Sequence, residues 1–198
     1  MSSREQILNA LRGNTRECYD MPDLSEISPI SFDNPVEQFV KKATTTAGAK
    51  VIEMADGESI DDIVRRAYPE AKIIASNLPD VTAQLNPDMV SEAQELASAD
   101  VGVIKGDIGV AENACIWIPQ TMREKAVCFA SEYLVIMLNR KDIVNNMHEA
   151  YALIDASDKY FQQYKFGTFI SGPSKTADIE SALVYGAQAA RGVTIVLI

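Results

Sequence analysis

The sequence of 198 residues has few of the residues that build metal centres. It contains a single histidine, His148, and three widely spaced cysteines, Cys18, Cys115 and Cys128, with no Cys-x-x-Cys pair. Zinc and iron–sulfur sites use closely spaced cysteines and histidines. We therefore expect no metal ion and no cofactor in this chain, and free thiols that suit a reducing compartment.

A long hydrophobic segment is also missing. The longest apolar run, 133–138, is far shorter than the roughly 20 residues that cross a bilayer as a helix. The N-terminal stretch MSSREQILNALRGN lacks the apolar core of a signal peptide. These two observations predict a cytoplasmic protein with no membrane span.

Positive charge is scarce. The formal net charge is −10 and hydrophobic residues make up 47% of the chain, a composition typical of a globular protein. An acidic surface repels the phosphates of nucleic acids, which argues against nucleic acid as a partner. A local basic pocket remains compatible with a small anionic ligand.

The N-terminal 31 residues are predicted to form an arm and a linker. Ser2 or Ser3 can cap a helix, with Glu5 or Gln6 completing a capping box. The segment 14–31 is polar and contains two prolines, which favours a linker. We expect the arm to dock on its own domain or on a partner, and the globular domain to span residues 32–198. The apolar face of the helix consists of Ile7, Leu8 and Leu11, and Gly13 ends it.

Helical and strand patterns alternate through most of the domain. Such alternation predicts an α/β fold, a three-layer α/β/α sandwich around a mainly parallel sheet. A turn is expected over 106–109. Strands are expected over 50–54, 72–75, 101–104, 115–118, 133–138, 168–170 and 193–198, and helices over 34–47, 59–68, 91–97, 142–154 and 176–188.

The segment 170–178 carries the most specific local pattern. A predicted strand ends at Ser171, Gly172-Pro173 forces a turn, and Ser174 and Thr176 can cap the expected helix. A helix N-terminus after a glycine turn offers free amides and partial positive charge to an anion. The alternative is a capped helix with no ligand. The residues of this expected anion-binding loop are Ser171, Gly172, Ser174, Lys175, Thr176 and Asp178.

Two motifs resemble a known family. ISGPSKTADIE resembles the signature of the LUD-domain family, of the lactate utilization protein C type, and GDIGVAENACIWI resembles a second block of that family. The resemblance implies the ribose-phosphate isomerase and CoA-transferase fold group. It also implies a component of an L-lactate utilization system that oxidises lactate to pyruvate with partner proteins carrying iron–sulfur clusters.

The chain departs from the family pattern at two places. Ala114 stands where the family often has glycine, and Gln188-Ala189-Ala190-Arg191 stands where it often has His-Gly-Pro-Arg, so that only Arg191 matches.

Glu112 is the candidate catalytic residue. The stretch VAENA resembles the Ser-Glu-Asn-Gly stretch that carries a nucleophilic glutamate in class I CoA transferases, and a carboxylate can also act as a general base. The alternative is that Glu112 orders the turn by accepting hydrogen bonds from backbone amides. Asn113 beside it is a candidate ligand-binding residue.

Arg191 can form a bidentate pair with the carboxylate of lactate or pyruvate, or it can be a surface arginine near a helix end. Cys115 and Cys128 are interpreted as buried thiols, and His148 as a half-exposed helical residue.

Three functions remain open on the sequence. The chain is a component of a lactate-oxidising assembly with iron–sulfur partners, a stand-alone transferase or isomerase for a phosphate- or CoA-type ligand, or a non-catalytic scaffold. A homo-oligomer is compatible with each of them.

Overall fold

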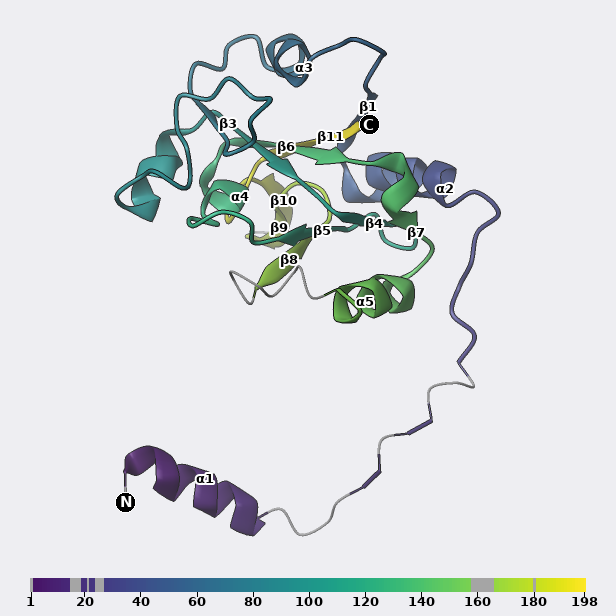
Figure 1. The fold of residues 1–198 in the computed structure, drawn as a ribbon, viewed down its shortest axis with the longest axis vertical. Helices are drawn as coiled ribbons and strands as arrows, with labels where there is room; N and C mark the ends of the chain where they lie inside the picture. The colour runs from purple at the N-terminus through teal and green to yellow at the C-terminus, as the bar shows by residue number, and fades with distance from the viewer. Residues whose placement is uncertain (1, 15–18, 21, 24–26, 158–165, 180) are drawn as a thin grey trace.

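The computed structural model describes the chain except residues 1, 15–18, 21, 24–26, 158–165 and 180 (Figure 1). Five strands form an all-parallel sheet in the order β1-β11-β6-β3-β2. This sheet confirms the predicted α/β class. Its strands are β1 (Lys50–Glu53), β11 (Gly192–Leu197), β6 (Tyr133–Leu138), β3 (Val101–Lys105) and β2 (Ile74–Ala75).

Helices cover both faces of the parallel sheet. Alternate residues of a strand point to opposite faces, so Val135 of β6 packs with the buried side of α3 (Ile60–Ala67). Its neighbours Leu134 and Ile136 belong to the larger core cluster on the other face, with residues of α2 (Pro35–Lys42) and α4 (Val127–Ala130). The apolar run 133–138 is therefore buried on both sides, as a central parallel strand requires.

Local sequence signals fix the starts of α2 and α3. The side chain of Asn34 accepts a hydrogen bond from the amide of Glu37 at the start of α2, and Ser59 caps α3 in the same way through Asp62. The chain after α2 continues as a π-helical turn, η1 (Ala43–Ala47), which ends at Gly48 with φ 79°. The short helix expected over 91–97 is a 3-10 helix, η2 (Ala93–Ser98).

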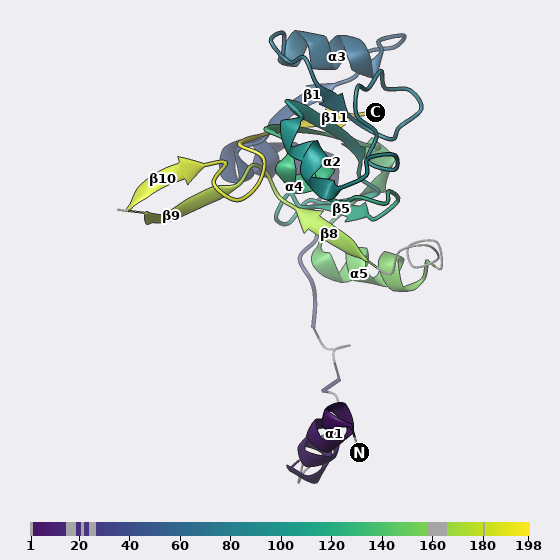
Figure 2. The ribbon, with the colours of Figure 1, turned by 90° about the vertical axis from the view of Figure 1, so that its left-hand side faces the viewer.

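A second sheet was not expected from the sequence. It has the order β7-β4-β5-β8, and only β4 and β7 run parallel within it. Helix α5 (Met147–Asp155) packs on it through Ala150 and Ile154 (Figure 2). The strands are β7 (Ile143–Val144), β4 (Ile108–Val110), β5 (Ile116–Pro119) and β8 (Gly167–Ile170).

This second sheet corrects two predictions. The turn expected over 106–109 is partly β4, because Gly109 pairs with both Ile116 and Ile143. The helix expected over 142–154 begins at Met147, because a 3-10 turn, η3 (Arg140–Asp142), and β7 precede it. Asn146 fixes that start by accepting a hydrogen bond from the amide of Glu149.

The largest correction concerns the segment 176–188, which is not a helix. It forms a two-stranded antiparallel hairpin, β9 (Lys175–Ile179) and β10 (Ala182–Tyr185), separate from both other sheets. Strand pairing between Tyr185 and Lys175, together with the hydrogen bond from Gly186 N to Ser174 O, satisfies backbone groups that a helix N-terminus would leave free.

A helix lies within the segment that was predicted as the N-terminal arm. Helix α1 (Ser3–Asn14) begins with a capping box, in which the amide of Ser2 donates to Glu5 Oε2 and the amide of Glu5 donates to Ser2 Oγ. None of its residues is buried, and it stands apart from the domain (Figure 1). No helix within the described residues is long and apolar enough to cross a membrane.

Candidate functional site

Glu112 lies in the turn between β4 and β5, and its carboxylate faces the start of α5. Its Oε2 accepts a hydrogen bond of 3.0 Å from the amide of Met147, the first residue of that helix, and its own amide donates to Asn145 O. A carboxylate at a helix N-terminus satisfies a free amide and interacts favourably with the helix dipole. The half-buried Glu112 thus accepts a backbone amide, as in the structural alternative, but this amide belongs to α5 and not to the turn of Glu112.

The next residues hold a tight turn. Asn113 Oδ1 accepts from the amide of Cys115 at 3.1 Å, and Ala114 is buried with a left-handed φ of 56°. That backbone conformation normally favours glycine, which gives a physical reason for the glycine that the family often has there. The turn therefore keeps its shape in this chain despite alanine.

Ser171 joins this turn to the end of β8. Its hydroxyl donates to Asn113 O at 2.9 Å. Gly172, with φ 68°, follows and lies so close to η1 that an added Cβ would come 2.3 Å from Ala47 O. Ser171, Gly172 and Asn113 are brought together, but they lie beside the second sheet rather than at the carboxyl edge of the parallel sheet.

Lys175 is held against the end of η1. Its ammonium donates to Thr46 O at 3.1 Å and to Ala47 O at 2.6 Å. A cation is favourable where carbonyl groups at a helical end lack partners. Thr176 and Asp178 lie further along β9, and the hydroxyl of Thr176 donates to the Asp178 carboxylate, which lowers the pKa of that exposed group.

The helix that was to supply amides for an anion is absent, so the electrostatic reason for an anion seat at 171–178 no longer holds. Two residues of the expected anion-binding loop have other contacts: Lys175 binds carbonyl groups of η1, and Ser174 forms hydrogen bonds at the base of the hairpin. There the amide of Ser174 donates to Ala190 O, and Ser174 Oγ lies 3.4 Å from the amide of Gln188.

Arg191 lies at the amino end of β11, near that base. Its guanidinium donates to Glu132 Oε1 at 2.9 Å and lies 5.2 Å from the ring centre of Tyr133. It lines a cavity of about 290 Å³ together with Glu132 and Gln188. The structure therefore groups Arg191 with Ser174 and Gln188, and it gives Glu112 different partners, Met147 and Asn145.

A larger cavity, of about 600 Å³, was missed by the sequence analysis. It lies where β3 and β6 leave the parallel sheet, an edge that commonly binds ligands in α/β proteins. The sequence pattern that could have indicated this cavity is the presence of charged residues at the ends of the two apolar strands β3 and β6. The cavity is lined by Lys105, Asp107, Ile108, Lys141, Asp142, Val144, Leu153, Ala156 and Ser157.

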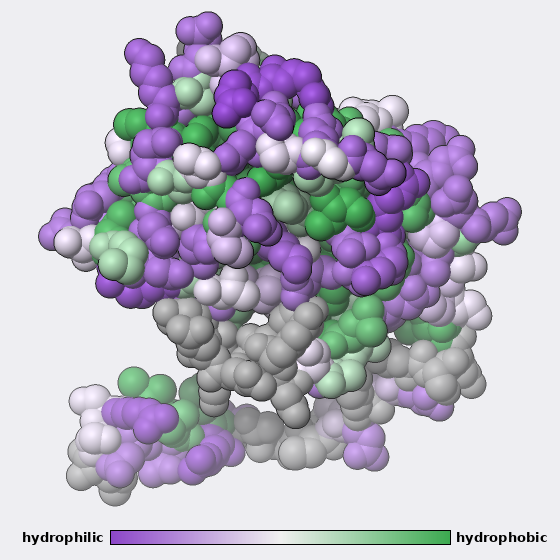
Figure 3. Space-filling model, turned by 45° about the horizontal axis from the view of Figure 1, so that its top comes forward, coloured by the Kyte–Doolittle hydropathy of each residue, from purple (hydrophilic) through white to green (hydrophobic). Residues whose placement is uncertain are grey.

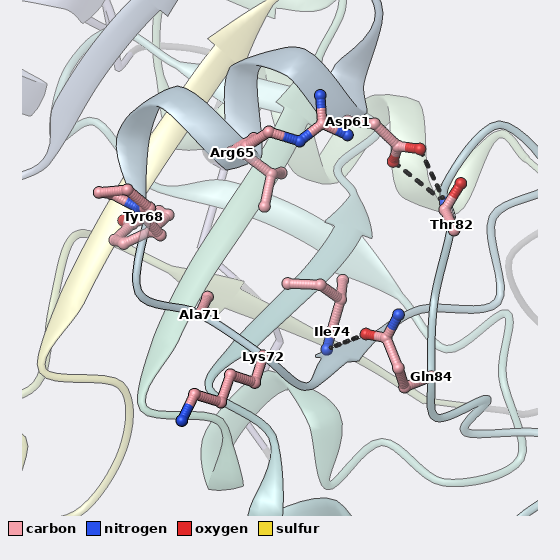
Figure 4. A pocket seen from close by; sticks show the side chains of 10 residues that line it. Asp61, Arg65, Tyr68, Ala71, Lys72, Ile74, Thr82 and Gln84 are labelled. Atoms are coloured by element: carbon pink, nitrogen blue, oxygen red, sulfur yellow. Dashed lines mark hydrogen bonds between the residues drawn. The ribbon is translucent and has the colours of Figure 1, made fainter.

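A smaller cavity of about 180 Å³ lies between α3 and the edge strand β2 (Figure 4). Its walls are tied together, because the Asp61 carboxylate accepts from the amide of Thr82 and Gln84 Oε1 accepts from the amide of Ile74. Arg65 and Lys72 come from opposite walls in this view. Arg65 already pairs with Asp62 at 3.0 Å, so this cavity offers a weaker anion site than its two cations suggest.

The two buried cysteines are poor nucleophiles. Burial raises the pKa of Cys115 and of Cys128 to about 12 in each case. Thiolates are the reactive form, which agrees with the interpretation of both residues as structural. Among the residues that the structure describes, no three side chains of His, Cys, Asp or Glu are grouped as a metal site.

Comparison with known proteins decides the family. The model of the LUD domain matches residues 81–198, which is more than half of the chain. The chain belongs to the LUD domain family. The matched region contains the Glu112 turn, the hairpin and Arg191, and membership of the family implies a lactate utilization protein.

A solved structure shares the fold of this chain. A DUF162 family protein from Deinococcus radiodurans aligns with 85% of this chain and 99% of its own, with a TM-score of 0.64 and 14% sequence identity. At that identity the likeness shows the fold alone. A search among curated proteins gave no match.

Proposed function

We propose that this LUD protein is a subunit of an assembly that oxidises L-lactate to pyruvate, in which partner proteins carry the iron–sulfur clusters. One observation carries the proposal: α1 has large apolar side chains that are exposed in the part of the chain that the structure describes. Ile7 and Leu11 are each 60% exposed and Leu8 is 37% exposed, and apolar side chains are visible on the arm in the lower left of Figure 3. An amphipathic helix of this kind binds in an apolar groove of another protein.

The linker gives the arm reach. Residues 15–34 separate α1 from α2, and an extended chain spans up to about 3.3–3.6 Å per residue. The arm can therefore contact a partner without bringing that partner against the Arg191 cavity. This division of labour suits a subunit that recruits an electron-transfer protein while its own domain binds the small substrate.

A pull-down tests the partner. Tagged protein from cells grown on L-lactate should copurify a protein with iron–sulfur absorbance, and Ile7→Lys with Leu11→Lys should abolish this. The matched control, Gln6→Lys with Asn9→Lys, adds the same charges to the polar face of α1 and should retain the partner. Equal loss in both variants, or no iron–sulfur partner with the unchanged chain, would contradict the proposal.

Within this assembly we propose a small carboxylate as the ligand of the chain, bound in the 290 Å³ cavity beside Arg191. The Arg191 side chain is 57% exposed, and its ion pair with Glu132 is at the surface, where such pairs stabilise little, so exchange of Glu132 for a ligand carboxylate costs little. Asn113, Ser171 and Gly172 do not line this cavity, and Ser174 is connected to its lining through Gln188.

Thermal-shift measurements with L-lactate, pyruvate, inorganic phosphate and an acyl-CoA test the ligand. Lactate or pyruvate should stabilise the chain, and Arg191→Lys should weaken the effect because lysine lacks the bidentate fork. Stabilisation by the acyl-CoA with a mass increase on Glu112 would favour the stand-alone transferase instead. No shift with any of these anions would favour the non-catalytic scaffold.

A further inference from the structure

The hairpin β9-β10 is a separate two-stranded sheet. It pairs with neither the five-stranded nor the four-stranded sheet, and it projects from the body of the molecule (Figure 2). Leu183 is 57% exposed and Tyr185 is 49% exposed. A two-stranded ribbon with no covering layer is marginally stable in water, so a projecting ribbon with large exposed apolar side chains indicates a surface that another chain covers.

The base of this ribbon is anchored firmly. Pro173 is buried, the amide of Ser174 donates to Ala190 O, and the amide of Gly186 donates to Ser174 O. Lys175 adds the two hydrogen bonds to η1. The domain therefore holds the hairpin in a defined direction, which an interface between folded chains requires.

The two strands differ in charge. β9 carries Lys175 and Asp178, whereas β10, with the sequence Ala-Leu-Val-Tyr, carries no charge and no proline. Among the residues that the structure describes, β10 pairs only with β9 and only on one side. Natural edge strands are usually protected from pairing by lysine, proline or a bulge that twists the edge away. Here the bulge lies between Ala182 and Val184 on the pairing with β9, and the sequence of β10 adds no protecting charge or proline.

We propose that β10 pairs in antiparallel fashion with β10 of a second copy of this chain, which produces a four-stranded sheet across a two-fold axis. A second copy fits better than a charged partner peptide, because the edge has no charge to select one and self-pairing places no like charges opposite each other.

The pleat restricts the register. Residues directly opposite in an antiparallel pair lie on the same face, so a two-fold axis perpendicular to the sheet must pass midway between one residue of the strand and the same residue of the second copy. With the axis at Val184, Leu183 lies opposite Tyr185 of the partner subunit. This register covers both large exposed side chains of β10, and aromatic–aliphatic cross-strand pairs of this kind are stabilising.

The expected oligomer is a dimer of the 21.7 kDa chain, measured by sedimentation equilibrium on the full-length protein. Leu183→Lys with Tyr185→Lys places like charges opposite each other and should raise the dimer dissociation constant by roughly tenfold or more. The control, Ile27→Lys with Met89→Lys, adds the same charges at exposed apolar positions outside the hairpin and should leave the dimer unchanged.

A disulfide tests the register. In a Cys18→Ser background, Val184→Cys should form a covalent dimer on oxidation, because opposed residues lie about 4.5–5.5 Å apart between Cα atoms, within the range of a disulfide. A monomeric chain, a dimer that survives the two lysines, or a Val184→Cys variant that does not cross-link would each overturn the proposal. Both lysine variants are checked by circular dichroism, so that loss of the dimer is read only from folded protein.

Discussion

Glu112 lies in a family motif and also contacts the start of α5, so a catalytic role and a structural role predict different effects of its substitution. Since Oε2 accepts from Met147 N at the start of α5, Glu112→Ala should lower the free energy of unfolding by about 1 kcal/mol. Glu112→Gln keeps an acceptor and should lose less. Thermal denaturation measures both variants, and a shift of roughly 2–4 °C per kcal/mol is typical at this chain length.

Growth on lactate separates the roles of Glu112. If it only caps α5, Glu112→Gln supports growth at the rate of the unchanged protein. If it acts as a nucleophile, Glu112→Gln abolishes growth while the thermal midpoint stays close to the original, because an amide cannot form the covalent intermediate.

The thiols give a second prediction at this scale. With the pKa of Cys115 and Cys128 raised by burial to about 12, a Cys18→Ser protein should react with a thiol reagent at neutral pH only after unfolding. The two protonated thiols contribute their full share of the stability below pH 9.0, which is the ordinary pKa of a cysteine. This share is lost as the pH rises toward 12, because the thiols of the unfolded chain ionise at a lower pH than those of the folded chain. Fast labelling of the native protein would contradict the burial of both thiols.

Some contacts of single residues can be predicted from the sequence and others cannot. The caps at Ser2, Asn34 and Ser59 were predictable, because each cap accepts from an amide three residues away. The partner of Glu112 was not, because the contact with Met147 spans 35 residues. Local chemistry is readable from the sequence, whereas a contact across the fold depends on the topology.

At the scale of elements, the strands of the parallel sheet were predicted well and the hairpin was not. The parallel strands are continuous apolar segments, as at 133–138, which burial on both faces demands. The segment 176–188 contains alanine, leucine and glutamate, which favour a helix. Pairing of Val184 with Thr176 overrides that preference, and the sequence of one strand cannot reveal its pairing partner.

Two glycines test how tightly the hairpin's base is packed. Gly172 and Gly57 both have a positive φ, 68° and 78°, but a Cβ on Gly57 meets nothing within 4 Å whereas one on Gly172 would meet Ala47 O at 2.3 Å. Gly57→Ala should cost about 1 kcal/mol from backbone strain alone. Gly172→Ala should cost at least about 1–2 kcal/mol more, since a core backbone must move.

Chemical denaturation with urea measures this difference between the glycine variants. Equal losses of stability in the two variants would show that the backbone after β8 can move to accept a Cβ without a loss of unfolding free energy. The hairpin would then not be anchored at Gly172. A matching loss of the dimer in Gly172→Ala alone would connect the base of the hairpin to the surface it presents.

At the scale of the molecule, the sequence predicts the parallel sheet and its helices but not the second sheet. β4 and β7 are short, and each follows soon after a strand of the parallel sheet. Asp107 lies between β3 and β4, and η3 lies between β6 and β7. Such short strands cannot be separated from turns by periodicity. Yet this second sheet positions Glu112, Asn113 and Ser171, so the geometry of the family motif depends on the part of the fold that the sequence leaves undetermined.

Deletion of the arm alone should leave the stability of the domain unchanged, whereas deletion of the arm and the linker should lower it. Because α1 has no buried residue, deletion of residues 2–14 should leave the thermal midpoint within about 1 °C of the original while the iron–sulfur partner is lost. A longer deletion through Phe32 should destabilise the domain by about 2–3 kcal/mol, because it removes the hydrogen bonds to Asn145 Oδ1 and from Asn146 Nδ2 and an apolar side chain packed on the core. If the short deletion lowers the midpoint as much as the long one, α1 packs on its own domain, and the arm is part of the fold rather than a docking element.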